Sequence, residues 1–330
     1  MTNRSTLQAK SAKRSKAVSS AKWNAVEYAA HSAVQQVWAR ELIARLHLRG
    51  DERILDVGCG DGKVTAEIAQ AVPRGCVVGI DASAEMIGFA RKTFPPSQIS
   101  NLKFQICDAR KIGGCDASSQ RGGHRANAAK IGDEGVAATA PFDIIFSNAA
   151  LHWVEDHEAI LRGMALVLKP GGRLVVSCGG KGNAQDVFVA LRPELRRKSW
   201  SKYFRKMPKP YFFYSPADYE KWLLKFGFKI QGLRLALKDI TYAGADGFAA
   251  WLRTTWLPYV QRVPEKVAQA SCLFDAPEKK LAGKTPAPLN LREEFIAAVT
   301  NRYLAKHPPD ADGKVHVKMM RLEIDAVKEF

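Results

Sequence analysis

The sequence predicts an α/β protein built on a doubly wound sheet. Short apolar stretches typical of buried parallel strands recur along the first 180 residues, and helical patterns separate them. A glycine-rich turn follows the first of these stretches, where a strand would pass directly into a helix. Alternation of strand and helix, with right-handed crossovers between parallel strands, produces this class of fold.

The individual elements can be placed in order along the chain. Apolar residues at helical spacing between 23 and 48 predict a helix ahead of the first strand. Strands are then expected at 53–57, 76–80, 103–107, 143–147, 173–178, 228–236 and 314–326. Helical patterns lie between them near 63–71, 83–92, 156–168 and 216–226. The elements therefore favour one large domain that runs from residue 23 to residue 330.

Several segments do not belong to this minimal fold. Residues 1–22 are basic, rich in Ser and Ala and without acidic residues, so we expect a disordered leader. Residues 113–141 lack periodicity and are rich in Gly and Ala, which predicts a mobile surface insertion. Residues 181–215 and 241–313 are aromatic and helical in character, and we expect them to form a cap over the carboxyl edge of the sheet.

Composition limits the class and the location of the protein. No apolar run approaches the ~20 residues that a membrane span needs. Six scattered cysteines predict reduced thiols, with neither a metal site nor a disulfide framework. The net charge is +17, of which the leader contributes +6. We expect a cytoplasmic protein, although the basic, Ser-rich start also resembles a mitochondrial transit peptide.

The glycine-rich turn, ILDVGCGDGKVT at residues 54–65, is the most informative stretch of the chain. Its glycines allow a sharp turn and a close approach of the backbone to a ligand, as at a nucleotide-like cofactor. The spacing is one residue shorter than in the dinucleotide fingerprint. Because Asp56 and Asp61 would repel a pyrophosphate, the turn favours S-adenosylmethionine, whose ammonium and sulfonium groups are cationic.

Two further strands end in polar groups that suit the same cofactor. Asp81 closes the apolar stretch CVVGID, 25 positions after Asp56, where a carboxylate can bind two ribose hydroxyls. Asp108 and Ala109 close the stretch FQICDA and suit an adenine amino group and a flat ring. The carboxyl ends of parallel strands meet at one edge of a sheet, so these groups and the turn predict one cofactor site.

With these motifs, the chain resembles the class I S-adenosylmethionine-dependent methyltransferases, and within them the trans-aconitate methyltransferase-like group. The matching stretches are ILDVGCGDGKVT (54–65), GIDASAEMI (79–87), CDA (107–109), FDIIFSNAALHWV (142–154) and LKPGGRLVV (168–176). The resemblance covers 23–112 and 142–240, and less diagnostically 251–260 and 314–328. It implies a Rossmann-like methyltransferase sheet of order 3-2-1-4-5-7-6 with the last strand reversed, and S-adenosyl-L-methionine as the cofactor.

The resemblance also assigns roles to single residues. On the acceptor side it implies Gln35 and Trp153. His152 is either a packed, hydrogen-bonded histidine or a general base, and we favour the first interpretation. The cofactor site that the turn, the strand ends and the resemblance indicate consists of Asp56, Gly58, Gly60, Asp81, Ala82, Met86, Asp108, Ala109, Asn148 and Ala149.

The acceptor is expected to be a free carboxylate in a small acid such as trans-aconitate, as the resemblance suggests. A carboxylate has a pKa of about 4, is already ionised at neutral pH and needs no general base. Arg253, Tyr259, Arg262, Tyr303 and Arg321 in the C-terminal segments would then clamp the remaining carboxylates of the substrate.

Other acceptors are compatible with the sequence. A carrier-bound malonyl group, a lipid or isoprenoid acid, or a polyketide carbon would suit the aromatic residues of the cap. The basic and aromatic stretch 192–213 would also fit RNA methylation. The chain lacks the N/D-P-P-Y/F turn and the Pro-Cys nucleophile of base methylation, which disfavours a nucleic-acid partner. A cofactor-binding regulator without turnover is disfavoured because the glycine turn is intact.

Overall fold

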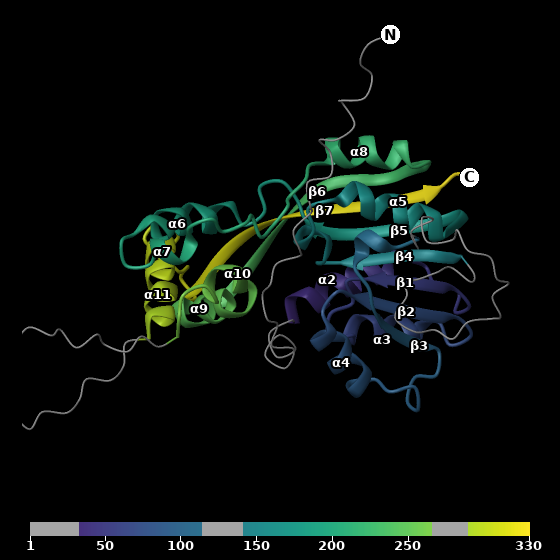
Figure 1. Cartoon of the computed structure of the whole chain (residues 1–330), viewed down its shortest axis with the longest axis horizontal. Coiled ribbons are helices and arrows are strands. Elements are labelled where there is room, and N and C mark those ends of the chain that lie inside the picture. The colour runs from purple at the N-terminus through teal and green to yellow at the C-terminus, as the bar shows by residue number, and fades with distance from the viewer. Residues whose placement is uncertain (1–32, 114–140, 266–289) are drawn as a thin grey trace, which may run out of the picture.

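The structure, a computed structural model, describes residues 33–113, 141–265 and 290–330. A seven-stranded sheet of order β3-β2-β1-β4-β5-β7-β6 forms its centre (Figure 1). The strands are β1 (Arg53–Val57), β2 (Cys76–Asp81), β3 (Leu102–Ile106), β4 (Phe142–Asn148), β5 (Leu168–Gly179), β6 (Phe228–Ala243) and β7 (Lys314–Lys328). Strands β1 to β5 are parallel, whereas β7 is antiparallel to both of its neighbours. The predicted fold class and strand order are confirmed.

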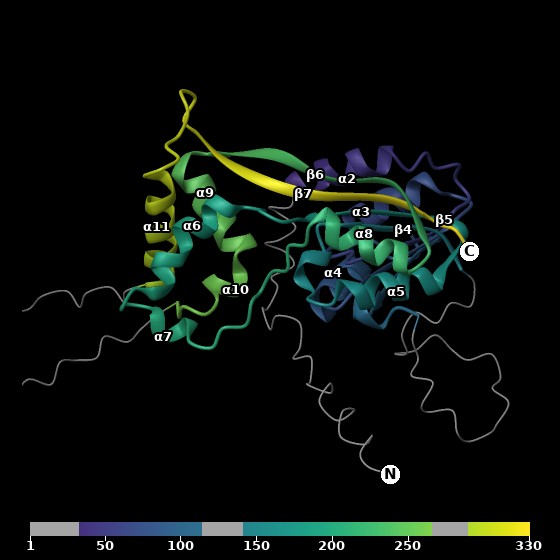
Figure 2. The same cartoon turned by 90° about the horizontal axis from the view of Figure 1, so that it is seen from above.

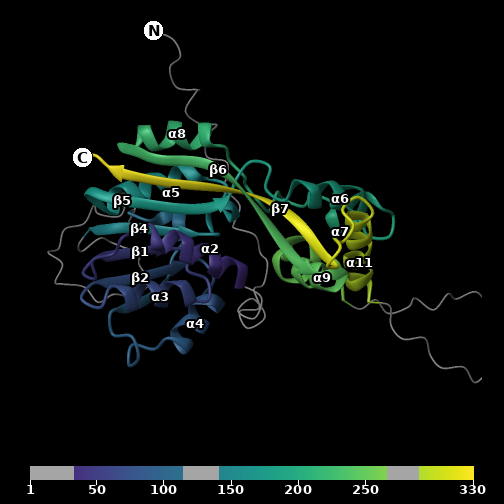
Figure 3. The ribbon, with the colours of Figure 1, turned by 180° about the vertical axis from the view of Figure 1, so that it is seen from behind.

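Helices cover both faces of the sheet. Those on one face are α2 (Ala33–Ala44), α3 (Lys63–Ala71) and α4 (Ala84–Thr93), and those on the other are α5 (His157–Val167) and α8 (Pro216–Lys225). Figure 3 shows α2 and α3 in front of the sheet. Successive strand residues point to opposite faces, so Ile54 joins the core under α3 and Leu55 joins the core under α5.

A group of helices projects from one end of the sheet (Figures 1 and 2). We call this group the helical lobe; it consists of α6 (Gln185–Arg196), α7 (Ser201–Phe204), α9 (Gly244–Thr255), α10 (Leu257–Val260) and α11 (Leu291–Leu304). Trp200, Phe248 and Tyr303 are at most 4% exposed in its core. The described parts of 181–215 and 241–313, where the sequence predicts a cap, supply these helices.

Strands β6 and β7 run from the sheet into the helical lobe (Figure 2). The prediction ended β6 at residue 236, but the strand continues to Ala243, and its outer half forms a two-stranded ribbon with β7. In this ribbon Leu237 lies opposite Met320, and Ala243 lies opposite Lys314. The polar residues of the ribbon obscure its strand pattern in the sequence, because a two-stranded ribbon exposes much of both faces.

Side-chain caps fix helices that lead away from the carboxyl edge of the sheet. Ser83 Oγ accepts a hydrogen bond from the N–H of Met86 at 3.2 Å and begins α4. Asp156 Oδ1 accepts one from the N–H of Ala159 at 2.8 Å and begins α5. Such caps satisfy N–H groups that have no partner inside the helix, and they fix where each helix starts.

Some sequence predictions fall outside the described residues. These are the leader 1–22, residues 114–140 of the insertion and residues 266–289 of the cap. Gln35 lies in the first turn of α2, but its side chain is not among those described. Within the described ranges, no helix is both long enough and apolar enough to cross a membrane.

Candidate active site

The glycine-rich turn connects β1 to α3 in left-handed backbone conformations. Gly58, Gly60 and Gly62 have φ angles of +79°, +54° and +82°. A Cβ atom on Gly58 would lie 2.1 Å from the Cβ of Ala150, so the turn contacts the loop after β4 closely. The N–H of Gly58 donates to the carbonyl of Ile80 at 2.7 Å. The turn therefore needs glycine for its own geometry as well as for access of a ligand.

A cavity of about 360 Å³ lies beside this turn, at the carboxyl ends of β1 to β4. We call it the cofactor cavity. Trp153, which the sequence assigns to the acceptor side, also lines it. All of the predicted cofactor residues except Asp56 line it, namely Gly58, Gly60, Asp81, Ala82, Met86, Asp108, Ala109, Asn148 and Ala149.

Asp56 lies beneath the turn and not on the cavity wall. It is 2% exposed and accepts a hydrogen bond from Thr65 Oγ1 at 2.7 Å, which ties β1 to α3. Burial raises the pKa of Asp56 to about 7, and the hydrogen bond from Thr65 opposes this rise. The sequence places this carboxylate against the cationic end of the cofactor, whereas the structure gives it a contact inside the protein.

Asp81 and Asp108 present their carboxylates at the cavity. Asp81 Oδ2 accepts from the N–H of Gly60 at 3.1 Å, and Oδ1 accepts from that of Ser83 at 2.8 Å. Burial raises the pKa of Asp81 against these bonds. Burial also tends to raise the pKa of Asp108, but hydrogen bonds from Arg110 outweigh this effect and hold the pKa below its usual value. The ribose hydroxyls and the adenine amino group of a nucleoside need hydrogen-bond acceptors at these places, so the cavity fits S-adenosylmethionine.

The residues after β4 are held in an uncommon conformation. Ala149 has φ +57°, a left-handed value that costs energy for a residue with a Cβ atom. Its N–H donates to the carbonyl of Ser177 in β5 at 2.7 Å, which keeps the loop in place. Ala149 lines the cofactor cavity and also a second cavity beyond it, so this strained residue marks the boundary between two sites.

The second cavity has a volume of about 100 Å³ and lies between the sheet and the helical lobe. We call it the aromatic cavity, because its walls are mostly rings. The aromatic side chains that line it are Trp38, Trp153, Phe188, Tyr211, Phe213, Tyr242, Trp251 and Trp256. Ala149 and Trp153 line both cavities, so a group bound in one of them lies next to a group bound in the other.

His152 lines the aromatic cavity as a neutral imidazole. Its Nδ1 accepts a hydrogen bond from the N–H of Gly179 at 3.3 Å, so the ring proton resides on Nε2. Burial, together with the positive charge of Arg321, lowers the pKa of His152 to about 3. This agrees with the interpretation of a packed, hydrogen-bonded histidine, since such a ring is too weak a base to remove a proton from an acceptor.

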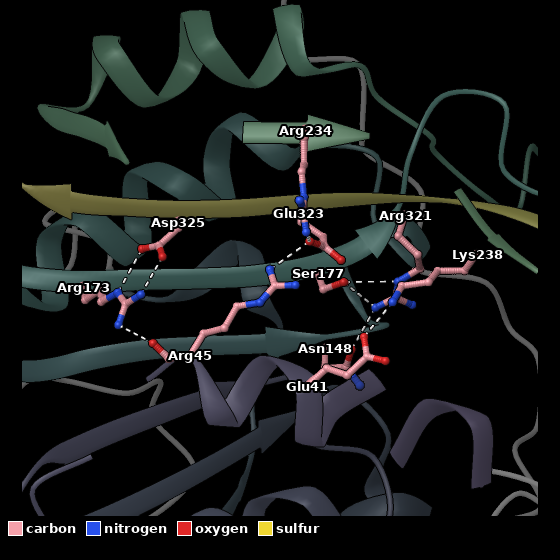
Figure 4. Close-up of polar contacts among 10 residues, drawn as sticks. All are labelled: Glu41, Arg45, Asn148, Arg173, Ser177, Arg234, Lys238, Arg321, Glu323 and Asp325. Atoms are coloured by element: carbon pink, nitrogen blue, oxygen red, sulfur yellow. Dashed lines mark hydrogen bonds and ion pairs between the residues drawn. The ribbon is translucent and has the colours of Figure 1, made fainter. Parts of the chain in front are cut away.

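Arg321 brings a positive charge to the same cavity. It is 3% exposed, and its guanidinium lies over the Trp38 ring, 4.3 Å from the ring centroid. Its Nη2 donates to Ser177 Oγ at 2.6 Å and to Asn148 Oδ1 at 2.8 Å (Figure 4). The sequence predicts several arginines of the C-terminal segments as substrate contacts. The structure shows that Arg321 is one that lines the aromatic cavity.

The structure does not bring Arg253 or Tyr259 to either cavity wall. Arg253 forms an ion pair with Glu293 of α11 at 2.5 Å. Tyr259 is 8% exposed and packs against the ring of Trp256, with 5.9 Å between the ring centroids. Arg253 therefore links α9 to α11, and Tyr259 packs inside the helical lobe.

Comparisons with known proteins agree with this geometry. The sequence model of a methyltransferase-domain family matches residues 48–207. An uncharacterized methyltransferase of Schizosaccharomyces pombe is 30% identical over 213 residues, which are 63% of this chain and 71% of that protein. A trans-aconitate 2-methyltransferase of Rhodopseudomonas palustris is 24% identical over 324 residues, which cover 93% of this chain and 100% of that protein.

A solved structure shows the same fold. The YcgJ protein from Bacillus subtilis superposes with a TM-score of 0.50 at 18% identity, over 89% of this chain and 99% of that one. The chain belongs to the class I S-adenosylmethionine-dependent methyltransferases. Within them it falls in the trans-aconitate methyltransferase-like group, and its cofactor is S-adenosylmethionine.

Proposed function

We propose that this enzyme transfers a methyl group to a carboxylate oxygen of a small organic acid, with trans-aconitate as the reference acceptor. The supporting observation is the lack, among the described lining residues of the aromatic cavity, of a group able to remove a proton at neutral pH. The pKa of His152 is about 3, and burial raises the pKa values of Tyr211 and Tyr242. This favours an acceptor whose nucleophilic atom needs no deprotonation in the site, as is true of a carboxylate.

The reaction then depends on position and on exclusion of water. When bound, S-adenosylmethionine supplies an electrophilic methyl carbon on a cationic sulfur. The carboxylate oxygen forms the new C–O bond while the S–CH₃ bond breaks and its electron pair stays on sulfur. The products are a methyl ester and S-adenosylhomocysteine, and no proton moves. Ala149 and Trp153, which line both cavities, lie where the two reacting groups would meet.

We take trans-aconitate as the reference acceptor because several similar proteins are named trans-aconitate 2-methyltransferases. Trans-aconitate 2-methyltransferases of Rhodopseudomonas palustris and Deinococcus radiodurans align with 93% and 80% of this chain. Their identities of 24% and 26% support a common architecture more strongly than a common substrate. The acid itself therefore has to be identified by experiment.

RNA methylation has less support, because the aromatic residues of the basic stretch 192–213 are used in packing. Trp200 is 4% exposed and packs edge-on against Phe295, with 5.5 Å between the ring centroids. Phe204 lies against the same ring at 5.3 Å. Recognition of single-stranded RNA needs aromatic rings that can stack on bases. We therefore propose a small-molecule partner and no nucleic acid.

Incubation of the enzyme with trans-aconitate and a cofactor labelled in its methyl group tests this proposal. The product should gain one methyl group, and mild alkali should release the label as methanol. At saturating cofactor, turnover should change by less than about twofold from roughly pH 6 to pH 9, because the nucleophile needs no deprotonation. An alkali-stable label, or a rate that rises about tenfold per pH unit, would identify a different acceptor atom.

A further inference from the structure

The aromatic cavity contains little charge. Among the lining residues that the structure describes, Arg321 is the one with a permanent charge, and His152 is neutral. Most of the remaining wall consists of Trp, Tyr and Phe rings, such as those of Phe188, Tyr211 and Trp256. A ligand that complements these walls has one anionic group and an apolar body, since rings provide no counter-charge for a second anion.

Two acidic residues that follow Arg321 along β7, Glu323 and Asp325, pair with basic residues from other elements. Glu323, two positions further along β7, binds Arg45 and Arg234 at 2.8 Å each. Figure 4 shows that Arg321 meets Ser177 and Asn148, whereas Lys238 pairs with Glu41 in a separate contact. Among the described lining residues, the positive charge at this wall of the aromatic cavity is that of Arg321.

Arg321 lies at the end of the aromatic cavity that adjoins the cofactor cavity. Its Nη2 donates to Asn148 Oδ1 at 2.8 Å, and Asn148 lines the cofactor cavity. The next residue, Ala149, lines both cavities. A carboxylate that contacts Arg321 is thus beside the boundary, with its body toward rings that line only the aromatic cavity, such as Phe188 and Trp256.

The walls and the volume set two limits on the acid. A second carboxylate would be buried among rings, which is costly for an ion without a counter-charge. Arg253 and Arg262, which the sequence offers as further clamps, do not line the cavity. The volume of about 100 Å³ is of the order of the ~150 Å³ apolar cavity that holds one benzene ring. The cavity therefore suits a compact acid better than a long-chain one.

Resting on the carboxylate methylation proposed above, we propose that the acceptor is a compact monocarboxylic acid with a flat, unsaturated or aromatic body. Arg321 binds its carboxylate, and the rings of the aromatic cavity enclose the rest of the molecule. Trans-aconitate, which has three carboxylates, is then a poorer acceptor than an acid of the same carbon skeleton with one carboxylate.

Three acids on one propene skeleton test this ranking. Crotonate, glutaconate and trans-aconitate have one, two and three carboxylates, and kcat/KM for methyl ester formation is measured with each and with benzoate. The value should fall by at least about tenfold from crotonate to trans-aconitate, and benzoate should match or exceed crotonate. Trans-aconitate as the best acceptor would overturn this ranking and leave carboxylate methylation standing. Failure of all four acids to form an ester would overturn the proposed function itself.

Benzoate binding to the complex with S-adenosylhomocysteine, measured by calorimetry, gives a readout that does not depend on turnover. Arg321→Gln should weaken this binding by at least about tenfold, and Arg321→Lys should restore part of it. Because Arg321 also contacts Asn148 and Ser177, affinity for S-adenosylhomocysteine is measured as well and should change by less than about threefold. The matched control Arg253→Gln should leave both affinities unchanged. Benzoate binding that is equally tight in Arg321→Gln would overturn the assignment.

Discussion

The cofactor cavity and the aromatic cavity adjoin, but they are built in different ways. The cofactor cavity takes Gly58, Asp81 and Asp108 from the ends of successive parallel strands, where main-chain geometry places them. The aromatic cavity takes its walls from distant parts of the chain, and Trp38 of α2 meets Arg321 of β7 there. The first depends on the backbone of the sheet, and the second depends on how the helical lobe packs.

This difference separates two properties of the enzyme. We propose that cofactor recognition depends on the glycine turn and the strand ends, where a Cβ added to Gly58 would lie 2.1 Å from that of Ala150. We propose that acceptor selection depends on the side chains of α2, the helical lobe and the β6–β7 ribbon that line the aromatic cavity, where single rings can be substituted. Substitutions on the two sides should therefore have separable effects.

The largest expected effect is at the glycine turn. Gly58→Ala should lower affinity for S-adenosylhomocysteine by more than about 100-fold, because the new Cβ would lie 2.1 Å from that of Ala150 at φ +79°. Gly171→Ala is the matched control, since Gly171 has φ +74° and open space around it. It should cost about 1 kcal/mol of unfolding free energy and leave cofactor affinity unchanged. Equal effects of the two substitutions would show that backbone strain, and not the close contact, is decisive.

The pH dependence of stability should differ in sign between Asp56, beneath the glycine turn, and His152, at the aromatic cavity. Burial raises the pKa of Asp56 to about 7, so between about pH 4 and 7 the folded state holds a proton that the unfolded state has lost. Its contribution to stability is therefore lost as pH rises. Burial lowers the pKa of His152 to about 3, so between about pH 3 and 6.5 only the unfolded state is protonated there. Its contribution is lost as pH falls.

Two variants measure these opposite signs by denaturant unfolding. Relative to wild type, Asp56→Asn should gain unfolding free energy as pH rises from roughly 5 to 7, by about 1 kcal/mol per pH unit. Relative to wild type, the unfolding free energy of His152→Asn should rise by a similar amount per pH unit as pH falls from roughly 6 to 4. Slopes of the same sign in both variants would contradict the assigned environments of these two side chains.

One substitution in each cavity, with a smaller expected effect, tests whether the two ligands bind independently. Asp81→Asn should weaken S-adenosylhomocysteine binding by about 10- to 100-fold through lost charge-assisted hydrogen bonds, with little effect on acid binding at saturating S-adenosylhomocysteine. Phe188→Ala removes a ring that lines only the aromatic cavity, so it should weaken acid binding by about tenfold and spare the cofactor. Both affinities are measured by calorimetry in both variants. If either substitution weakened the binding of S-adenosylhomocysteine and of the acid equally, the two sites would be coupled.

The same comparison explains what the sequence could predict. The positions of Asp81 and Asp108 at the cofactor cavity follow from a local rule, because polar groups at the ends of parallel strands meet at one edge of the sheet. Asp56 lies in the same motif, yet its side chain contacts Thr65 beneath the turn, a direction that the motif alone does not reveal. The outer end of β6, residues 237–243, also escaped prediction, because its pairing with β7 outside the sheet leaves only a weak apolar pattern.

The acceptor side could not be predicted residue by residue. Arg321 and Arg253 look alike in the sequence, but the antiparallel pairing of β7 with β5 sets Arg321 opposite Gly179, beside the loop after β4. Arg253 meets Glu293 of α11 instead. Which arginine reaches the cavity depends on contacts between residues far apart in the chain, and such contacts leave no periodic signal in the sequence.

A crystal structure with S-adenosylhomocysteine and benzoate tests the central claim most directly, namely that one cavity binds the cofactor and the adjoining cavity binds the acid. We predict ribose hydroxyls on Asp81, the sulfur atom beside Ala149 and Trp153, and the benzoate carboxylate on Arg321. A nucleoside bound outside the cofactor cavity, or a carboxylate held away from Arg321, would contradict the account.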